Sequence, residues 1–365
     1  MRIAQVVASY TPQIGGVETH VQRLAQGFVE AGDRVTVLTH GVRGYPADER
    51  VNGVRILRFP MTISSRNYPI SLSLFRYLRL HATDFDLAHA HNYHTLAGQA
   101  AIRSRLPFVF TPHYHGTGHT WFASFLHTLY RRPGARLFAR ADAIVCVSDA
   151  ERDLVAREFP AAAAKIVIIP NGIDPKQVLV DDDRVMPGTP LVLTVGRLER
   201  YKNVDLVIDA FRALPTSATL VVVGDGPDRT RLEKRAGGSA GWPVRFAGRI
   251  SDPMLGQLFA QADVVTSASD HEAFGLTLAE GLASGARVVA SAIPAHAALG
   301  RLAGTGTALS LVDPRDTSRF TDLLAESLLA GRPQAGGLKL PTWGEAAKQT
   351  RKLYSQVLLQ GPKAK

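Results

Sequence analysis

The first forty residues decide the fold class. They open with the run Ile3-Ala4-Gln5-Val6-Val7-Ala8, pass through Gly15-Gly16, and continue into a segment, 17–31, whose apolar side chains recur at helical spacing. A second apolar run, at 35–38, comes after Gly32, a residue type that commonly ends helices. Because a strand, a helix and a strand in this order form a βαβ unit, this stretch predicts a parallel sheet covered by helices on both faces.

The same alternation continues through the rest of the chain. Further strand-like runs lie at 54–58, 87–90, 108–111, 143–147 and 166–169, and a second series lies at 191–195, 219–223, 244–247, 264–267 and 287–290. Turn formers and charged residues gather between the two series, across 175–189, which is typical of a linker. We therefore expect an α/β protein with two doubly wound parallel-sheet domains, followed by an amphipathic helix at 343–359.

Composition limits the possible functions. The 365 residues include 42 Lys+Arg against 32 Asp+Glu, a net charge of +10, and a single cysteine, Cys146, so a disulfide framework is excluded. No apolar run reaches the roughly 18 residues of a membrane span, and no signal-peptide pattern opens the chain. We expect a cytoplasmic protein whose basic surface meets a phosphorylated small molecule or an anionic membrane, and not nucleic acid, because its few aromatic residues lie largely at core spacing.

The strongest candidate site follows the strand-like run at 264–267. It reads Ser269-Asp270-His271-Glu272-Ala273-Phe274-Gly275-Leu276-Thr277-Leu278-Ala279-Glu280. A helix that begins near Phe274, with Gly275 in its first turn, would offer free backbone amides to a phosphate. Glu272 in the loop and Glu280 in the helix are then placed to accept hydrogen bonds from sugar hydroxyls. The structural alternative is an ordinary helix start with acidic capping charge.

Two further loops are candidates for phosphate binding. Arg197 and Lys202 follow the run at 191–195, and both side chains bind phosphates well. Gly15-Gly16 would let the backbone approach a phosphate closely, although it lacks the full glycine fingerprint of dinucleotide-binding folds. A solvated basic loop and a simple tight turn are the respective alternatives. Likewise, Val223-Gly224-Asp225-Gly226-Pro227 either borders a base or phosphate or is only a turn.

Histidines are concentrated in the first half of the chain. They cluster in His89-Ala90-His91-Asn92-Tyr93-His94 and in His113-Tyr114-His115-Gly116-Thr117-Gly118-His119, each at the end of a predicted strand. We expect no zinc site, because no carboxylate or cysteine nearby completes a usual ligand set. Histidines that bind hydroxyls or a phosphate are favoured instead, with His113 the best placed.

In this order and spacing, the motifs resemble the retaining nucleotide-sugar glycosyltransferases of family 4, also described as glycosyl transferases group 1. The resemblance covers nearly the whole chain and rests on Gly15-Gly16-Val17-Glu18, Asp86-Leu87-Ala88-His89-Ala90-His91, Thr111-Pro112-His113, Ile169-Pro170-Asn171-Gly172-Ile173-Asp174, Gly196-Arg197-Leu198 with Lys202-Asn203, Val223-Gly224-Asp225-Gly226-Pro227, and the pair Glu272 and Glu280. It implies the GT-B fold, in which two Rossmann-like domains face each other across a cleft. Residues 1–175 with a crossing helix at 343–365 would form the acceptor domain, and 190–342 the donor domain.

The resemblance implies roles around the donor diphosphate. Arg197 and Lys202 would bind the diphosphate, with Gly15 and Gly16 approaching it from the first domain. Glu280 would hold the ribose. Such enzymes usually need no metal and no other cofactor, so positive side chains and a helix end would stabilise the leaving diphosphate.

The resemblance also implies roles around the donor sugar. Glu272 would contact the sugar hydroxyls, and His113 would lie near the reacting centre, so that His113, Glu272, Arg197 and Lys202 form the catalytic group. The backbone that would support the sugar belongs to Ala273, Phe274, Gly275 and Leu276. One departure concerns Ser291-Ala292-Ile293-Pro294-Ala295-His296, where relatives often carry a glycine-rich turn followed by Glu.

The implied reaction is retaining transfer of a hexose or N-acetylhexosamine from GDP-mannose or a UDP-sugar to a hydroxyl acceptor. The acceptor is left open among lipid-linked, polysaccharide and small natural-product compounds. A nucleotide-sugar epimerase of the same fold and a non-catalytic sugar-binding protein are the alternatives. The basic, apolar segments 72–80 and 121–132 are either ordinary amphipathic helices or contacts with an anionic membrane, in which case the protein is peripheral at the inner face of that membrane.

Overall fold

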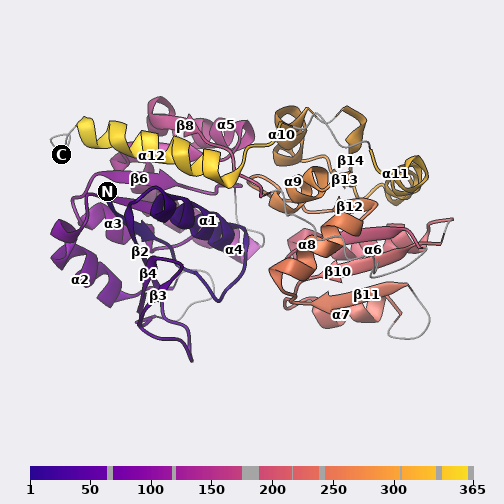
Figure 1. Cartoon of the computed structure of the whole chain (residues 1–365), viewed down its shortest axis with the longest axis horizontal. Coiled ribbons are helices and arrows are strands. Elements are labelled where there is room, and N and C mark those ends of the chain that lie inside the picture. Colours follow the sequence, from indigo (N-terminus) through magenta and orange to yellow (C-terminus); the bar gives the residue numbers. More distant parts are fainter. Residues whose placement is uncertain are drawn as a thin grey trace. The chain divides into compact units, whose positions relative to one another are not determined.

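The chain forms two compact units in the computed structural model: Met1–Gly172 with Pro341–Lys365, and Ile173–Leu340 (Figure 1). The structure describes residues 1–63, 69–116, 121–174, 189–215, 217–237, 243–304, 306–333 and 339–360, without the side chains of 121–129 and 307. Nearly all of the predicted linker at 175–189 therefore lies outside the described residues. None of the described helices combines the length and the apolar character that crossing a membrane requires.

Unit 1 is built on an eight-stranded sheet with the order β3-β4-β2-β1-β5-β6-β7-β8. Its strands are β1 (Arg2–Val6), β2 (Arg34–His40), β3 (Asp48–Val51), β4 (Val54–Phe59), β5 (Leu87–His91), β6 (Phe108–Thr111), β7 (Ala143–Cys146) and β8 (Ile166–Ile168). Seven of these strands run parallel, as expected, but β3 pairs antiparallel with β4 and was not predicted. A short edge strand of mostly charged, exposed residues lacks the apolar alternation that reveals other strands.

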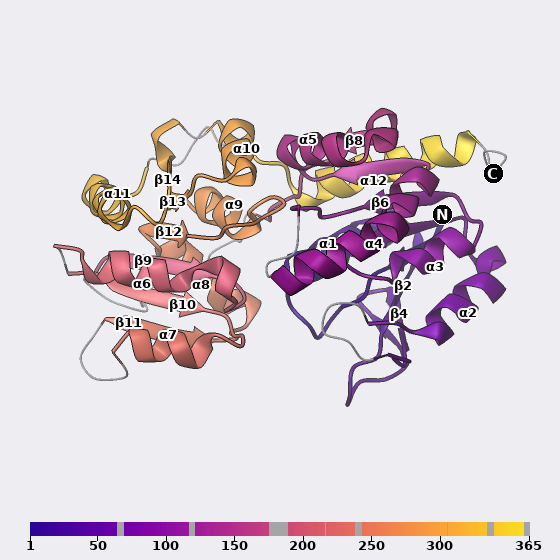
Figure 2. The same ribbon diagram turned by 180° about the vertical axis from the view of Figure 1, so that it is seen from behind.

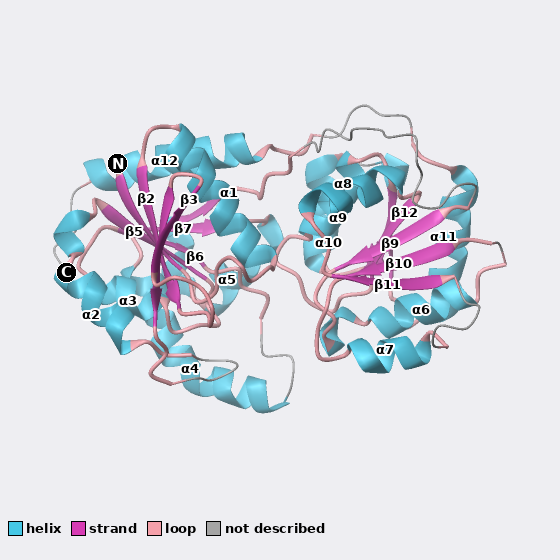
Figure 3. Ribbon diagram, turned by 60° about the horizontal axis from the view of Figure 1, so that its bottom comes forward, coloured by secondary structure: helices cyan, strands magenta, loops and turns pink. Residues whose placement is uncertain are grey.

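Helices cover both faces of this sheet (Figure 3). They are α1 (Gly16–Glu30), α2 (Leu72–Leu80), α3 (Gly98–Arg103), α4 (Trp121–Arg140), α5 (Asp149–Glu158) and α12 (Trp343–Leu359). Alternate side chains of β1 separate the two faces: Ala4 and Val6 join the apolar cluster under α2, α3 and α4, whereas Gln5 donates a hydrogen bond to Tyr354 of α12. The face under α1 and α12 is therefore partly polar.

Helix α12 lies beside α1 within unit 1, although it is the last helix of the chain (Figures 1 and 2). Its start is fixed by a capping box, in which the Thr342 hydroxyl accepts a hydrogen bond from the Glu345 amide and the Glu345 carboxylate accepts one from the Thr342 amide. Close packing against α1 depends on Gly27, because a Cβ there would lie 2.6 Å from the Ala347 Cβ. The predicted helix at 343–359 is confirmed.

Unit 2 contains a six-stranded parallel sheet with the order β11-β10-β9-β12-β13-β14. The strands are β9 (Leu191–Val195), β10 (Thr219–Val223), β11 (Val244–Gly248), β12 (Val264–Ser267), β13 (Arg287–Ser291) and β14 (Leu309–Val312). The helices are α6 (Val204–Arg212), α7 (Arg229–Arg235), α8 (Asp252–Gln261), α9 (Leu276–Ala283), α10 (Pro294–Ala303) and α11 (Thr317–Ala330). Strand β14 was not predicted, whereas the five expected strands of this unit are present.

Candidate functional site

The direction of strand addition in unit 2 reverses between β9 and β12, which are hydrogen-bonded neighbours. In open parallel sheets, ligands bind beyond the carboxyl ends of the strands at such a switch point. The loop after β9 contains Arg197 and Lys202, and the loop after β12 contains Glu272. The fold therefore brings two loops that are far apart in the sequence to one edge of the sheet.

One backbone hydrogen bond and one hydrogen bond from a side chain to the backbone join these loops. The Asp270 amide donates a hydrogen bond of 2.8 Å to the Tyr201 carbonyl. Asn203 adopts the left-handed conformation, with φ 49°, and its side-chain amide donates a 3.0 Å bond to the Ala268 carbonyl. Asparagine tolerates this backbone region better than most residues, so Asn203 both turns the chain into α6 and fixes the second loop.

The glycine turn after β10 supports the loop that carries Arg197. Leu198 donates a 3.1 Å backbone bond to Asp225 and accepts a 3.0 Å bond from the Asp228 amide. A Cβ at Gly224, where φ is 126°, would overlap the Gly196 carbonyl oxygen, and a Cβ at Gly226 would overlap the Leu198 carbonyl oxygen. The glycines after β10 thus have a structural reason: they let two strand-end loops pack backbone against backbone.

Lys202 and Glu272 form an ion pair in which the Lys202 ammonium donates a hydrogen bond to the Glu272 carboxylate. Each side chain is about one-fifth exposed. Burial alone would raise the pKa of Glu272, but the Lys202 charge and hydrogen bond outweigh burial and lower the pKa below its ordinary value. Burial alone would lower the pKa of Lys202, and Glu272 likewise reverses that direction. Both groups are therefore charged near neutral pH.

Arg197 lies at the other end of the same loop and is the more exposed cation, with 59% of its side chain accessible. Its guanidinium lies 3.3 Å from the Glu199 carboxylate and donates a 3.2 Å hydrogen bond to the Tyr201 hydroxyl. Together, Arg197 and Lys202 place positive charge at the carboxyl end of β9. Such an edge favours an anionic ligand.

Helix α9 begins at Leu276, not near Phe274 as predicted. Gly275 precedes the helix with φ 93°, and the helix's own hydrogen bonds start with the Leu278 amide, which donates to the Gly275 carbonyl. The amides of Leu276 and Thr277 therefore precede the hydrogen-bond ladder of the helix, which is the arrangement that attracts anions. The start was misplaced because Phe274 extends the apolar pattern although its backbone is not helical.

The predicted carboxylates and backbone positions occupy neighbouring places in this unit. Glu272 and Ala273 lie in the loop, Phe274 is buried, and Glu280 lies in the second turn of α9. Among the predicted site residues of this unit, Lys202 and Glu272 are in direct contact.

His296 is a site neighbour that sequence reasoning did not identify as functional. It lies in α10, after β13, and its Nδ1 lies 2.8 Å from the Ser291 carbonyl oxygen, to which it donates. A Cβ at Gly275 would lie 3.3 Å from the His296 ring, so this imidazole packs directly against the start of α9. Burial lowers the pKa of His296, which keeps the ring neutral. The sequence signal that could have identified His296 was its position shortly after the predicted strand at 287–290.

The remaining predicted site residues, Gly15, Gly16 and His113, belong to unit 1. Gly15 is the residue before α1 and has an extended backbone that any residue can adopt, so its glycine identity is not required by φ. A side chain at Gly15 would instead meet the Glu18 carboxylate. His113 follows β6, is 7% exposed and has a left-handed backbone, with φ 46°. Its imidazole lies among other histidines, described below.

Comparisons of the sequence with known proteins agree on one family. A sequence model described as Glycosyltransferase Family 4 matches residues 14–177, and one described as Glycosyl transferases group 1 matches residues 189–329. The GDP-mannose-dependent alpha-(1-6)-phosphatidylinositol dimannoside mannosyltransferase of Mycobacterium tuberculosis is 30% identical over 329 residues, covering 80% of this chain and 79% of that protein. The phosphatidyl-myo-inositol mannosyltransferase of Mycobacterium leprae is 28% identical over 387 residues, covering 100% and 99%.

The fold agrees with the family. The structure of sucrose-phosphate synthase from Thermosynechococcus elongatus matches with a TM-score of 0.76 at 21% identity, covering 99% of this chain and 100% of that chain. Two parallel-sheet α/β units, the two family matches and the mycobacterial relatives lead to the same assignment. The chain belongs to glycosyltransferase family 4 and is a hexosyltransferase of the GT-B fold.

Proposed function

We propose that the enzyme transfers a hexose from a nucleotide diphosphate sugar to a hydroxyl acceptor with retention of anomeric configuration. The observation that carries this proposal is the Lys202–Glu272 ion pair at the switch point of the unit 2 sheet. In this pair, a cation that would bind the diphosphate lies next to a carboxylate that would bind sugar hydroxyls. GDP-mannose is the donor we favour, because the M. tuberculosis relative is named as GDP-mannose-dependent.

In this proposal, charge on the leaving diphosphate is stabilised by protein groups alone. Arg197, Lys202 and the first amides of α9 are positive or partly positive groups in unit 2, so they can perform the role that a metal ion performs in other transferases. Glu280 would hold the ribose from the second turn of the same helix. On the unit 1 side, Gly15 and Gly16 would approach the diphosphate.

We propose that the acceptor attacks from the face that the diphosphate leaves. The bond between the sugar C1 and the phosphate oxygen breaks, the bond between C1 and the acceptor oxygen forms, and the acceptor proton passes to the departing phosphate oxygen. Glu272 is engaged by Lys202 and by sugar hydroxyls in this scheme, so it is not assigned as a covalent nucleophile. His113 would lie near C1 and orient the donor sugar.

The acceptor we propose is an inositol lipid, because both mycobacterial relatives are named for phosphatidylinositol compounds. Helix α2 supports contact with an anionic membrane from unit 1. Leu74 and Leu78 are buried against the sheet, but Leu72 and Leu80 are 61% and 59% exposed, and the arginines of this helix are exposed as well. The second segment considered for this role, 121–132, has most of its side chains outside the described part of the chain.

The proposal is tested by measuring nucleotide release from GDP-mannose, UDP-N-acetylglucosamine and UDP-glucose, with phosphatidylinositol vesicles or free myo-inositol as acceptor. We expect release of GDP that depends on the vesicles, and an α-linked mannolipid by NMR. Epimerisation of the donor sugar in the absence of any acceptor would show that the enzyme is an epimerase and not a transferase. Donor binding without turnover of any acceptor would support the sugar-binding alternative. Turnover of myo-inositol alone would exclude the lipid acceptor.

A further inference from the structure

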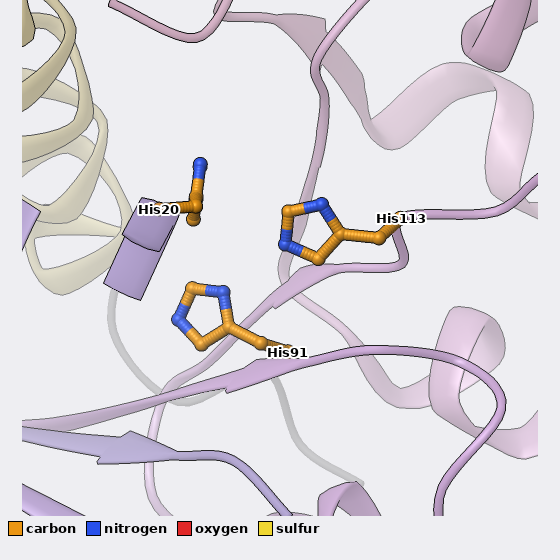
Figure 4. A group of neighbouring side chains, drawn as sticks. All are labelled: His20, His91 and His113. Atoms are coloured by element: carbon orange, nitrogen blue, oxygen red, sulfur yellow. The ribbon is translucent and has the colours of Figure 1, made fainter. Parts of the chain in front are cut away.

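Three histidines from separate segments of unit 1 meet beneath α1 (Figure 4). His20 belongs to α1, His91 ends β5, and His113 follows β6. One ring nitrogen of each lies within 4.8 Å of a ring nitrogen of both others, and the three residues are buried. The ring centroids of His20 and His113 are only 4.7 Å apart, with the rings nearly perpendicular.

Each of these rings has a buried nitrogen that no protein group satisfies. In the described part of the chain, His20 Nε2, His91 Nδ1 and His113 Nε2 have no hydrogen-bond partner. Buried polar atoms are nearly always paired, and unpaired ones often indicate a bound water or ion. Three unpaired nitrogens from three adjacent rings therefore point to one ligand that contacts all of them.

Neighbouring amides determine which nitrogens of His20 and His91 carry hydrogen. His20 Nδ1 lies 2.7 Å from the Asn171 side-chain oxygen, and His91 Nε2 lies 2.5 Å from the Gln5 side-chain oxygen. Because an amide oxygen only accepts, each of these ring nitrogens donates. The unpaired His20 Nε2 and His91 Nδ1 are then lone-pair acceptors, which cannot hydrogen-bond to each other but can both ligate a cation.

The hydrogen bonds to Gln5 and Asn171 match the outer shell that orients metal-binding histidines. Gln5 is itself fixed, since its side-chain amide donates a 3.1 Å bond to the Tyr354 hydroxyl, which also lies 2.6 Å from His89 Nδ1. Imidazole binds a metal through the lone pair of its unprotonated nitrogen, and the hydrogen bonds to Asn171 and Gln5 leave such a nitrogen on His20 and on His91.

We propose that His20, His91 and His113 bind one divalent transition-metal ion, of the class of Zn²⁺, through their three unpaired ring nitrogens. Three histidines are an established ligand set for zinc, with a fourth position left for water or another ligand. In a tetrahedral site with ordinary zinc–nitrogen bonds, ligand nitrogens lie about 3.4 Å apart. Rotations of the rings would bring nitrogens that now lie within 4.8 Å of one another to this spacing.

This inference departs from the expectation of no metal. The two histidine clusters in the sequence have no carboxylate or cysteine nearby to complete a zinc site, whereas the structure adds a third histidine, His20, from helix α1. The ion would tie the first turns of α1 to the carboxyl ends of β5 and β6, independently of the diphosphate groups of unit 2. Its expected effect is on the stability of unit 1, and because His113 is also proposed to lie near the donor sugar, metal binding is measured in the absence of donor.

The test is a titration of the chelator-treated full chain with Co²⁺, followed by visible absorption and by metal analysis after dialysis. We expect one Co²⁺ per chain, with the intense visible bands of a tetrahedral site, displacement of Co²⁺ by Zn²⁺, and a rise in the melting temperature. His20→Ala, His91→Ala and His113→Ala should each abolish the bands. Asn171→Ala should weaken binding roughly 10- to 100-fold, because it removes an outer hydrogen bond.

Controls separate this site from weak binding elsewhere. His81→Ala removes an exposed histidine that lies outside the cluster, and we expect it to bind Co²⁺ as the wild type does. Circular dichroism of each metal-free variant shows whether it is folded, and Asn171→Ala keeps all three ligands should a histidine variant not fold. Absence of stoichiometric binding by the folded wild type would overturn the proposal and leave a bridging water as the partner. Unchanged binding in the folded histidine variants would overturn it as well.

Discussion

The ion pair of Lys202 with Glu272 places a positive charge and a carboxylate on adjacent loops of unit 2. Each residue of the pair stabilises the charged form of the other: Glu272 raises the pKa of Lys202, and Lys202 lowers the pKa of Glu272. At the residue scale, the proposed chemistry therefore depends on this pair more than on any other contact of the predicted site. Arg197 adds charge but is more exposed.

Replacement of Lys202 or Glu272 tests the pair through turnover. We expect Lys202→Met and Glu272→Gln each to lower kcat/KM by about 100-fold or more, the scale seen when one preorganised electrostatic group is lost. Lys234→Met, which removes an exposed lysine from α7, is the matched control and should leave turnover unchanged. Wild-type rates in folded Lys202→Met or Glu272→Gln would contradict the assigned roles.

The lowered pKa of Glu272 predicts an acid dependence of stability. Because the carboxyl is more acidic in the folded than in the unfolded chain, its contribution is complete above the unfolded pKa of 4.5 and is lost as the pH falls through the folded pKa. The free energy of unfolding of unit 2, measured with urea between pH 6 and 3, should therefore fall less steeply with pH in Glu272→Gln than in the wild type. The two slopes should differ by at most about 1.4 kcal/mol per pH unit, the value for one proton. Equal slopes in the two proteins would contradict this account.

At the scale of elements, the site is held by loops that pack against loops. The turn after β10 supports the loop after β9, and Asn203 connects that loop to the one after β12. The glycines of the turn therefore help to position the loop that carries Arg197. A residue with a side chain at Gly224 has to push the Gly196 carbonyl away, because its Cβ would overlap that oxygen.

Alanine at Gly224 should therefore cost more than alanine at an open left-handed glycine. Gly304 is a suitable control in the same unit, since φ is 62° and no atom lies within 4 Å of an added Cβ. We expect Gly304→Ala to lower the free energy of unfolding by about 1 kcal/mol and Gly224→Ala to lower it by roughly 3 kcal/mol or more. Denaturant unfolding of the two variants measures the difference, and equal costs would show that the backbone contact is unimportant.

Sequence patterns located the strands that are buried on both faces, and with them the strand-end positions of Arg197, Lys202 and Glu272. They missed β3, whose residues are mostly charged, and placed the start of α9 too early. The relation of His20 to the other histidines depends on how α1 packs on the sheet, which no local pattern encodes. The support that Gly224 gives to Gly196 is likewise visible only in the packed structure.

At the scale of the whole molecule, the end of the chain completes the unit in which the chain begins. Helix α12 packs on α1, and Tyr354 joins Gln5 and His89 in a buried hydrogen-bonded group. Arg351 of the same helix also pairs with Asp33, which follows α1. Unit 1 is therefore discontinuous in sequence, whereas unit 2 is formed by a single segment.

Deletion of residues 341–365 should consequently affect only unit 1. We expect the shortened chain to lose the cooperative unfolding of unit 1, because the apolar face of α1 and the polar groups around Gln5 lose their cover, while unit 2 still melts cooperatively. Calorimetry combined with hydrogen exchange measures the two units separately. A chain that lacks only its last five residues is the control. Intact protection of α1 after the longer deletion would contradict this description.

Binding of the diphosphate to unit 2 is the central claim, and calorimetric titration of the enzyme with GDP and UDP tests it most directly. The account predicts saturable binding of at least one of these nucleotides by the wild type. It predicts affinity at least tenfold weaker in Lys202→Met, and unchanged affinity in Lys234→Met. Equal affinity in the wild type and folded Lys202→Met, or no binding of either nucleotide, would contradict the claim.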